Sequence, residues 1–450
     1  MNTRPDLTLA AAQRARFLAA LGTDYALLFG APERLRNGDA EYRYRPSSDV
    51  LYLTGWADPH CAVLLRPGAE QPFVMFVQPR DREMEVWSGR RPGPEGACET
   101  FGASLAYPID ELATRLPELL LGARTLHYRF AEDADRDRML VGALAKARKL
   151  ARRNLLDVPD AFVDPARLLH EQRLRKAPEE IAILRHAAGI TREAHLRAMA
   201  ITAPGVHEFE LEGEIEGTFR RRGGTGAGYT TIVGGGANAT VLHYISNDQP
   251  LRDGDLVCVD AGCEFQYYTA DVTRTWPVNG RFTEAQRALY EVVLAAQMAA
   301  VDACRPGATF KGVHDLTTRL LTEGMVRLGL LPGDADDPAV IDDHIEKGRQ
   351  KRYFPHGTSH WLGLDVHDVG AYSGAGRSRV LEPGMVLTVE PGLYVQPDDE
   401  DAPADLRGIG IRIEDDVLVT DSGPDVLTAG IPKAIDEVEA AVGGGVATVR

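Results

Sequence analysis

The sequence predicts an α/β domain followed by an α+β domain that contains an internal repeat. Three observations support this fold class. The chain has 450 residues, which is more than one hydrophobic core usually supports. Strand-like and helical patterns alternate over the first third of the chain, and two similar blocks of helices and strands follow. We place the boundary near residue 172, which gives domains of residues 1–172 and 173–450.

Short apolar runs bounded by turn residues predict the strands of the first domain. They are residues 25–29, 50–53, 62–65, 73–77 and 125–130. Two stretches with helical spacing, residues 7–21 and 109–121, alternate with these strands. A basic helical stretch at residues 145–154 and two proline-containing breaks then close the domain. This alternation is typical of a small α/β unit.

The second domain contains two copies of the order helix, helix, strands. In the first copy, Ala177-Pro178-Glu179-Glu180 begins a helix with proline and acids in its first turn, and Pro204-Gly205 precedes a second helix. In the second copy, Thr283 and Gln286 have the spacing of a capping box, and Pro306-Gly307 again precedes a helix. Strands follow each pair of helices.

Each copy carries a carboxylate at the end of a strand. Residues 251–262 and 381–392 share a glycine turn, an apolar run, an acid, a small or helix-breaking residue and a second glycine. The two acids are Asp260 and Glu390. An acid buried after several aliphatic residues is costly unless a cation meets it, so two such sites in a repeat suggest a shared cation. The alternative is that both acids are solvated turn residues. We would favour that interpretation if only one of the two copies were present.

A second acid accompanies each of these carboxylates. Asp271 follows Asp260 after a glycine turn and a returning strand, and a hairpin can place both acids on one face. In the second copy Glu414 accompanies Glu390, and strand alternation puts Arg412 and Glu414 on the same side. Four carboxylates, two from each copy, can therefore face one another.

A histidine-rich segment lies between the acids. His356, His360 and His367, three of the twelve histidines, fall within twelve residues. A single histidine would more often be a structural residue. His356 and His360 have the i, i+4 spacing of a zinc-binding helix, but Gly357-Thr358-Ser359 is a poor helix former and no HExxH glutamate is present. We therefore do not expect a helical zinc site.

Four carboxylates, with or without an imidazole, form an oxygen-rich site that suits Mn, Mg or Zn better than copper or an iron–sulfur cluster. Their negative charges would balance two divalent ions, and bridging carboxylates would hold these about 3.5 to 4 Å apart. Such a pair lowers the pKa of a shared water to near neutrality. The pattern indicates a dinuclear hydrolase.

Composition excludes several classes of partner. The net charge of -16 disfavours nucleic acid and anionic membranes, because both require a basic surface. The five cysteines contain no CxxC pair and are typical of reduced core residues. The sequence has neither a signal-like segment nor an apolar stretch of spanning length, so we expect a cytoplasmic protein. The acidic segments 333–343 and 398–401 are predicted to be solvated loops.

The chain resembles the Xaa-Pro aminopeptidases, also called aminopeptidase P, of the pita-bread metallopeptidase family. The resemblance covers nearly the whole chain. Its most specific motifs are HGTSHWLGLDVHD, from His356, and GIGIRIEDD, from Gly408, and residues 41–49, 85–91 and 229–234 also match. Thr358 is a mild departure from the pattern. The resemblance implies an α/β N-terminal domain and an α+β pita-bread domain with a pseudo-twofold internal repeat.

The resemblance also implies the ligands of two divalent metal ions, usually Mn²⁺, with Zn²⁺, Co²⁺ and Mg²⁺ as alternatives. These ligands are Asp260, Asp271, His360, Glu390 and Glu414. Asp271 and Glu414 would bridge the ions, and Glu390 would also act as the general base.

Further residues receive roles from the same resemblance. Three histidines would bind the substrate carbonyl or assist the tetrahedral intermediate. They are His243, His356 and His367. Arg412 would orient the ligand cluster. The residues that would contact the substrate are Tyr229, Asp39 and Trp87. The alternative interpretations are that Asp39 is an acid in a turn and that Trp87 is an aromatic residue of the domain core.

The implied reaction is hydrolysis of the bond between an N-terminal residue and a penultimate proline, by a hydroxide bridging two divalent metals. This bond is a tertiary amide without the N–H that ordinary peptidases use. The alternatives are a prolidase, which accepts only Xaa-Pro dipeptides, and a non-catalytic peptide-binding protein of the same fold, which would typically have lost ligands. The implied assembly is a homodimer or a homotetramer, in which Trp87 reaches a neighbouring subunit's site.

Overall fold

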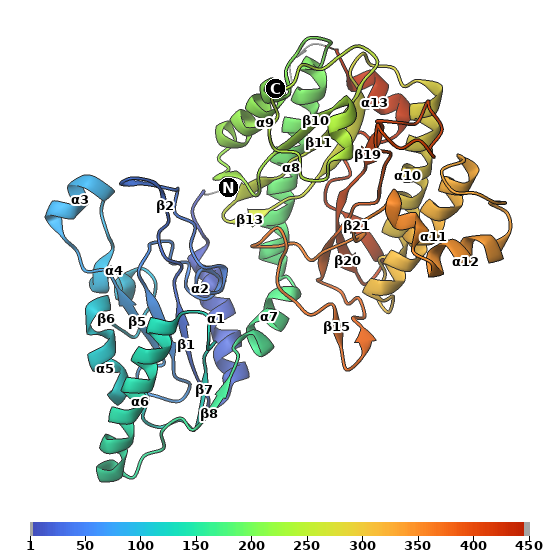
Figure 1. The fold of residues 1–450 in the computed structure, drawn as a ribbon. Helices are drawn as coiled ribbons and strands as arrows, with labels where there is room; N and C mark the ends of the chain where they lie inside the picture. Colours follow the sequence, from blue (N-terminus) through green and yellow to red (C-terminus); the bar gives the residue numbers. More distant parts are fainter. Residues whose placement is uncertain (1–2, 445–450) are drawn as a thin grey trace. The chain divides into compact units, whose positions relative to one another are not determined.

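The computed structural model describes residues 3–444 and divides the chain into two compact units (Figure 1). One unit spans Arg4–Gln172, and the other contains Arg173 and the residues that follow it. Among the described residues, no helix combines the length and the apolar character needed to cross a membrane.

The N-terminal unit is an α/β unit built on a sheet with the strand order β6-β5-β4-β1-β7-β8. Its strands are β1 (Tyr25–Phe29), β4 (Ala62–Leu65), β5 (Phe73–Val77), β6 (Leu105–Pro108), β7 (Thr125–His127) and β8 (Ala161–Val163). β1 runs antiparallel to β4 and parallel to β7. The sheet is therefore mixed, as its combination of hairpin and crossover connections requires.

Helices cover both faces of this sheet (Figure 1). On one side, α5 (Leu112–Leu119) and α6 (Ala134–Asn154) share a buried core with the strands. On the other lie α1 (Leu7–Leu21) and α2 (Ser48–Thr54). Smaller elements complete the unit. They are the hairpin of β2 (Leu35–Asn37) and β3 (Ala40–Glu41), the helices α3 (Arg82–Ser88) and α4 (Gly93–Glu99), and the 3₁₀ turn η1 (Ile109–Glu111).

Two details of the predicted structure are wrong, and a third is largely right. The predicted strand at residues 50–53 lies in α2, whose end is marked by Gly55 in the left-handed conformation (φ 71°). These residues are buried, and a short apolar run without alternation does not separate strand from helix. Part of the predicted loop 333–343 belongs to α12 (Pro338–Glu346), which Asp337 caps. The predicted solvated loop 398–401 is largely confirmed, since the segment is a loop and residues 398, 400 and 401 are exposed, while Asp399 is buried and pairs with Arg352.

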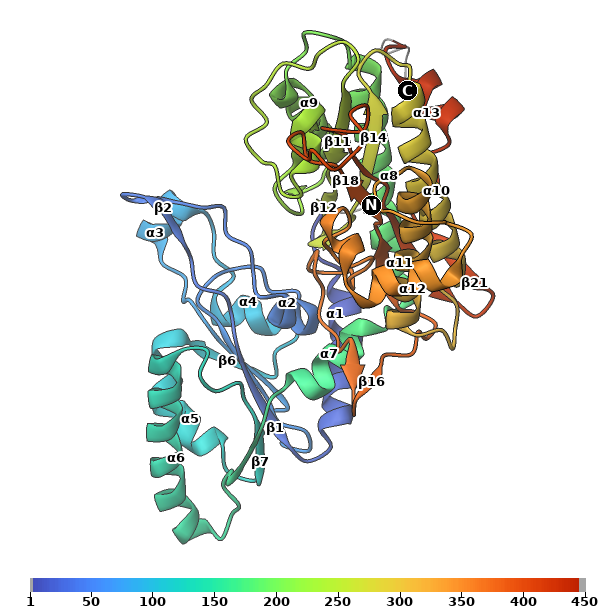
Figure 2. The ribbon, with the colours of Figure 1, turned by 45° about the vertical axis from the view of Figure 1, so that its right-hand side comes forward.

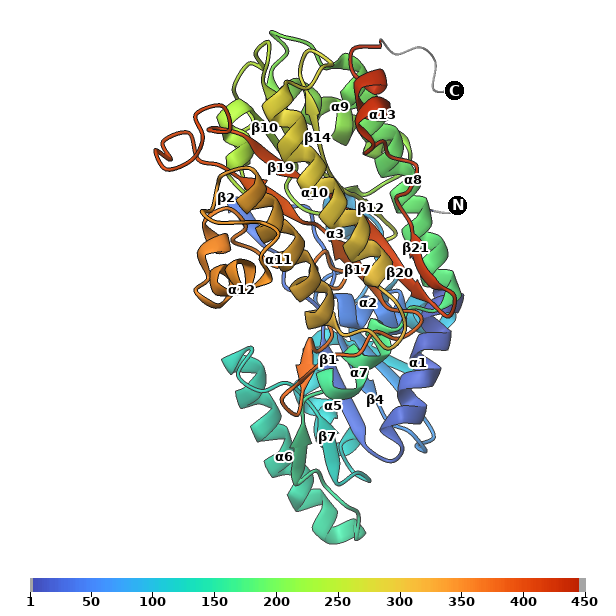
Figure 3. The same ribbon diagram turned by 90° about the vertical axis from the view of Figure 1, so that its right-hand side faces the viewer.

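The C-terminal unit contains the two predicted pairs of helices. α8 (Pro178–Ile201) packs on α9 (Glu208–Arg221), and α10 (Glu284–Ala303) packs on α11 (Phe310–Arg327). The expected caps are present: Glu180 accepts from the backbone N–H of Ala177, and Thr283 and Gln286 form a reciprocal capping box. Figures 2 and 3 show α8 and α10 running alongside the strands of this unit.

The strands of the two halves repeat the same arrangement. In the first half, β11 (Leu256–Asp260) lies between β10 (Ile232–Gly235) and β14 (Thr273–Pro277). In the second half, β20 (Asp415–Thr420) lies between β17 (Val386–Val389) and β21 (Gly423–Val426). Asp260 is opposite Thr273 in the first register, and Val389 is opposite Asp415 in the second. Both halves therefore place their acids at equivalent strand ends.

The other elements of the chain are shorter. They are α7 (Ala166–Leu174), β9 (Gly226–Ala227), η2 (Gly236–Thr240), β12 (Cys263–Phe265), β13 (Tyr268–Thr269), η3 (Arg349–Arg352), β15 (Ser373–Gly374), β16 (Arg377–Ser378), β18 (Gly392–Tyr394), β19 (Gly410–Arg412) and α13 (Ile435–Ala441). β12 and β13 form a hairpin between Asp260 and Asp271. The five cysteines are free, and Cys98 is the one that is not fully buried.

Candidate metal centre and active site

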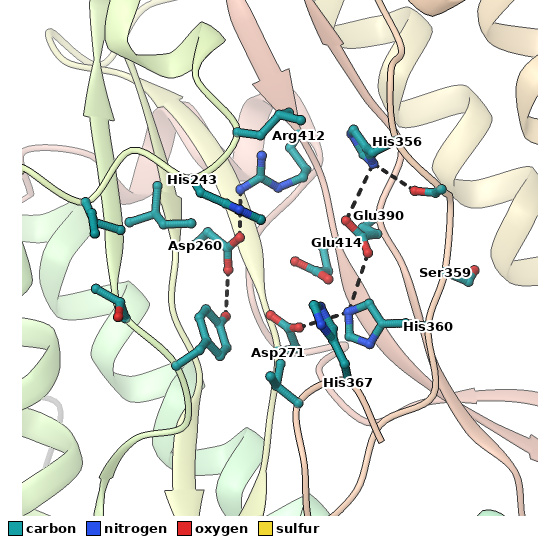
Figure 4. A pocket seen from close by; sticks show the side chains of 17 residues that line it. His243, Asp260, Asp271, His356, Ser359, His360, His367, Glu390, Arg412 and Glu414 are labelled. Atoms are coloured by element: carbon teal, nitrogen blue, oxygen red, sulfur yellow. Dashed lines mark hydrogen bonds and ion pairs between the residues drawn. The ribbon is translucent and has the colours of Figure 1, made fainter. Parts of the chain in front are cut away.

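A cavity of about 540 Å³ in the C-terminal unit brings together most of the predicted site residues (Figure 4). The predicted residues that line it are Tyr229, His243, Asp260, Asp271, His356, His360, His367, Glu390, Arg412 and Glu414. They come from both repeated halves. Asp39 and Trp87 instead belong to the N-terminal unit, where both are exposed.

Asp260 is held at the end of β11 by two neighbours. Its Oδ1 accepts a hydrogen bond from the Tyr229 hydroxyl at 2.6 Å, and its Oδ2 accepts from Nη2 of Arg412 at 2.7 Å. Arg412 is only 4% exposed and also donates from Nε to the Thr273 hydroxyl at 2.9 Å. A planar guanidinium fixed in this way orients the carboxylate, so Asp260 needs little rearrangement to bind a cation.

Asp271, His360 and Glu414 form the tightest group of donor atoms. Each offers one ligand atom, and these atoms lie within 4.8 Å of one another. Nε2 of His360 is 3.3 Å from Oδ2 of Asp271, while Nδ1 is 3.0 Å from the carbonyl oxygen of Trp361. The carbonyl contact assigns a proton to Nδ1, so Nε2 is the nitrogen that faces the acids. Burial lowers the pKa of His360, but Asp271 and Glu390 outweigh this and raise it to about 9, so Nε2 must lose its proton to serve as a ligand.

Glu414 joins the two halves at the centre of the site. Its carboxylate accepts from the Thr273 hydroxyl at 2.7 Å, and its backbone N–H donates to the Thr273 carbonyl at 3.0 Å. Arg412 and Glu414 both face the cavity, while Ile411 and Ile413 are fully buried in the core beneath them. The predicted alternation of this segment is therefore confirmed.

Glu390 follows β17 and faces the same centre. Its Oε1 is 3.5 Å from Nε2 of His360, and its Oε2 is 3.8 Å from Nδ1 of His356. Its backbone N–H donates to the carbonyl of Thr358, so the strand end and the histidine-rich loop are fixed together. That loop is not helical, as the sequence predicts.

The electrostatics of the centre fit cations. Burial raises the pKa of Asp271, and repulsion from Asp260 adds to this. Burial together with neighbouring carboxylates raises the pKa of Glu414, and a similar balance raises the pKa of Glu390 to about 7. The protein therefore supplies less positive charge than these acids require when ionised. A set of carboxylates and one imidazole is chemically suited to divalent ions, which would balance this negative charge.

The remaining histidines differ in their surroundings. Burial and the charge of Arg412 lower the pKa of His356 to about 4, so its imidazole is neutral at pH 7. Its Nε2 lies 2.9 Å from the Tyr394 hydroxyl. His367 is exposed, and its ring centroid is 4.4 Å from that of His360. In Figure 4 His243 lies across the cavity from His356 and His360.

Several residues of the site are absent from the sequence-based set. Tyr394 links His356 to Nη1 of Arg412, to which its hydroxyl oxygen lies at 3.1 Å. Asp416 accepts from the backbone N–H of Asp271 at 3.2 Å and so supports a predicted ligand from behind. Thr273 touches both Arg412 and Glu414. The acidic run Glu414-Asp-Asp416 was a signal in the sequence from which Asp416 could have been predicted. Single Tyr and Thr residues within strands carry no such signal.

Comparisons with known proteins agree with this geometry. Residues 182–421 match metallopeptidase family M24, and residues 10–127 match the aminopeptidase P N-terminal domain. The Xaa-Pro aminopeptidase of Escherichia coli (strain K12) is 46% identical over 417 residues, which cover 92% of each chain.

Solved structures are also similar. Aminopeptidase PepP of Pseudomonas aeruginosa superimposes with a TM-score of 0.93 at 43% identity and covers 98% of both chains. A zinc-substituted E. coli aminopeptidase P in complex with product has a TM-score of 0.91 at 43% identity, covering 97% of this chain and 98% of the other.

Proposed function

Since the chain belongs to metallopeptidase family M24 and carries the aminopeptidase P N-terminal domain, we propose that it hydrolyses the bond between an N-terminal residue and a penultimate proline. The observation that carries the proposal is the convergence of donors from both halves on one cavity. Similarity over nearly the full length to Xaa-Pro aminopeptidases favours this activity over that of a prolidase. The enzyme is a metal-dependent hydrolase.

The proposed ligands of two divalent ions are Asp260, Asp271, His360, Glu390 and Glu414. Asp271 and Glu414 are the proposed bridging residues, and Mn²⁺ is the proposed native metal. When bound, such ions polarise a substrate carbonyl and make water a stronger nucleophile at neutral pH. The raised pKa values of the buried acids support this set, because nearby cations would offset the repulsion among them.

The side chains of the chain then have separate tasks. Glu390 is the proposed general base, and its carboxylate accepts the proton of the attacking water. His243, His356 and His367 face the substrate, and the neutral His356 can donate or accept a hydrogen bond at the reacting carbonyl. Arg412 keeps Asp260 oriented, and Tyr229 does so from the opposite oxygen.

The cavity also suits the substrate that we propose. Leu242, Ile245 and Val366 contribute apolar surface next to the acidic centre. A proline ring can be buried on such a surface while its amide faces the polar side, since the amide has no N–H that requires an acceptor. Asp39 and Trp87 remain proposed contacts for the substrate.

The proposed assembly is a homodimer or homotetramer. Helix α3 exposes two large apolar side chains, Val86 at 82% and Trp87 at 85% of their surface. Exposed apolar residues of this size are typical of contact surfaces between proteins. A second copy of the chain is the proposed partner.

A peptide assay tests the proposed function. Protein stripped of metal and reconstituted with Mn²⁺ should release the first residue of an Xaa-Pro-Xaa tripeptide and leave the matched Xaa-Ala-Xaa peptide intact. Cleavage of Xaa-Pro alone would indicate a prolidase. The absence of metal-dependent release from either substrate would identify a peptide-binding protein instead.

A further inference from the structure

The segment that carries His243 is an exposed loop. It connects η2 to β11, and Leu242, His243 and Ile245 from this loop line the cavity. Ile245 is 57% exposed, and His243 is also exposed. A loop with so little burial has few apolar contacts to fix its position, so other interactions must hold His243 in place.

One buried carboxylate binds both sides of this loop. Glu208, the first residue of α9, has no exposed surface. Its Oε1 accepts from the backbone N–H of Gly235 at 2.8 Å and from the Asn238 amide at 3.0 Å. Its Oε2 accepts from the Tyr244 hydroxyl and from the backbone N–H of Gln249, both at 2.9 Å. Donors before and after His243 thus converge on one side chain.

A second contact ties the loop to the same helix. Asn247 is 1% exposed and has a positive φ of 46°. Its amide donates to Oε2 of Glu212 at 3.0 Å, and its Oδ1 accepts from the backbone N–H of Val233 at 3.0 Å. Glu208 and Glu212 are one helical turn apart, so the same face of α9 supplies both acceptors.

We infer that Glu208 is a positioning residue that holds His243 over the metal centre. A buried carboxylate is costly unless donors satisfy both of its oxygens, and here the donors flank the loop. The position of Glu208 at the beginning of α9 is also favourable for a negative charge. The carboxylate therefore fixes the entry and the exit of the loop, while the cavity-facing residues between them remain accessible to substrate.

This inference rests on the proposed function, because the position of His243 affects the rate only if His243 takes part in the proposed reaction. Replacing Glu208 by Gln keeps the size of the side chain but turns one acceptor into an N–H₂ group that faces other donors. We expect Glu208→Gln to lower kcat by about ten- to hundredfold. KM for the tripeptide should change by less than about threefold, because the loss concerns the transition state.

A double-mutant cycle with His243→Ala tests whether Glu208 acts through His243. Glu208→Gln should cost less than about twofold in kcat once His243 is absent. Equal losses in both backgrounds, or no loss in the wild-type background, would overturn the inference. If wild-type protein fails to cleave the tripeptide, the proposed function fails instead, and the two failures are thus distinguished.

Two further variants control for folding and charge. Tyr244→Phe removes one hydroxyl donor and should reproduce a smaller part of the kcat loss while the protein remains folded. Glu179→Gln removes an exposed acid from the first turn of α8 and should leave kcat unchanged. Metal content should equal that of the wild type in every variant. Loss of metal in Glu208→Gln, or an unaltered kcat in Tyr244→Phe, would argue against a positioning role.

Discussion

Thr273 and Glu414 bind each other twice, although they belong to different repeated halves. The Thr273 hydroxyl donates to the Glu414 carboxylate at 2.7 Å, and the Glu414 N–H donates to the Thr273 carbonyl at 3.0 Å. Both residues lie in the buried part of the site. This pair therefore aligns Glu414, a proposed bridging ligand from the second half, with β14, the strand that follows Asp260 and Asp271 in the first half.

Removal of the Thr273 hydroxyl should weaken metal binding. Thr273→Val keeps the shape of the side chain but leaves Glu414 and the Nε of Arg412 without a partner at that point. We expect metal affinity to fall about 10- to 100-fold, as for other lost supporting contacts. Titration of the stripped protein with Mn²⁺ measures this. Thr317→Val is the control, because that buried hydroxyl donates to the Val313 carbonyl of its own helix and to no other group in residues 3–444.

Glu390→Gln should abolish turnover and leave the fold intact. An amide of the same size cannot accept a proton from water, so we expect kcat to fall about 10²- to 10⁴-fold. Steady-state rates on the tripeptide and a circular dichroism spectrum check both parts. Glu382→Gln, which changes a half-exposed carboxylate paired with Arg175, should have no effect on kcat. A Glu390→Gln variant with the kcat of the wild type would exclude the role of general base.

Asp368 should stabilise the protein in a pH-dependent way. It pairs with Arg173 at 2.6 Å and with Lys176 at 3.0 Å, and all three side chains are almost fully buried. Burial by itself raises the pKa of Asp368, but Lys176 and Arg173 outweigh it and hold the pKa below the ordinary value. The stabilisation is therefore present above the unfolded-state pKa of about 3.9 and is lost as the pH falls through the lower folded-state value.

Asp368→Asn should consequently destabilise the C-terminal unit by about 3 kcal/mol at pH 7. The difference from the wild type should shrink below about pH 4. Thermal unfolding at several pH values measures both effects. Asp315→Asn, which breaks an exposed pair with Lys311, should change stability by less than about 0.5 kcal/mol. A destabilisation of Asp368→Asn that does not depend on pH would contradict this account.

Trp87→Ala should weaken self-association. Because the indole is 85% exposed on α3, its removal cannot create a large cavity in the N-terminal unit. We expect light scattering to show smaller particles than for the wild type at the same concentration. Val141→Ala, which shortens an exposed apolar side chain on α6, is the matched control. An unchanged mass for Trp87→Ala would remove this residue from the proposed interface.

The repeated acids were the most predictable part of the molecule. Asp260 and Glu390 each end an apolar run that begins after a glycine turn. This pattern can be recognised in the sequence because both the strand and the turn have local signals. The cavity confirms that Asp271 and Glu414 face the same space. Among the supporting residues, Arg412 was expected from the resemblance, whereas Tyr394 could not be predicted, since its role depends on contacts with His356 and Arg412 that no sequence spacing encodes.

Local signals also explain the errors in the fold. Residues 50–53 are buried on every side, so the period that separates helix from strand is missing. The left-handed Gly55 and the acid Asp49 in the first turn were the available signs of a helix. In the acidic segment 333–343, Asp337 followed by Pro338 was a helix start that the density of negative charge obscured.

The division of the donor set between two halves has a consequence for biosynthesis. The chain emerges from the ribosome N-terminus first, and each domain folds as a unit. Asp260 and Asp271 are therefore synthesised before Glu390 and Glu414, although all four belong to one compact unit. The complete set of proposed ligands exists only once synthesis has passed Glu414, so we expect tight metal binding to follow synthesis of the whole C-terminal unit.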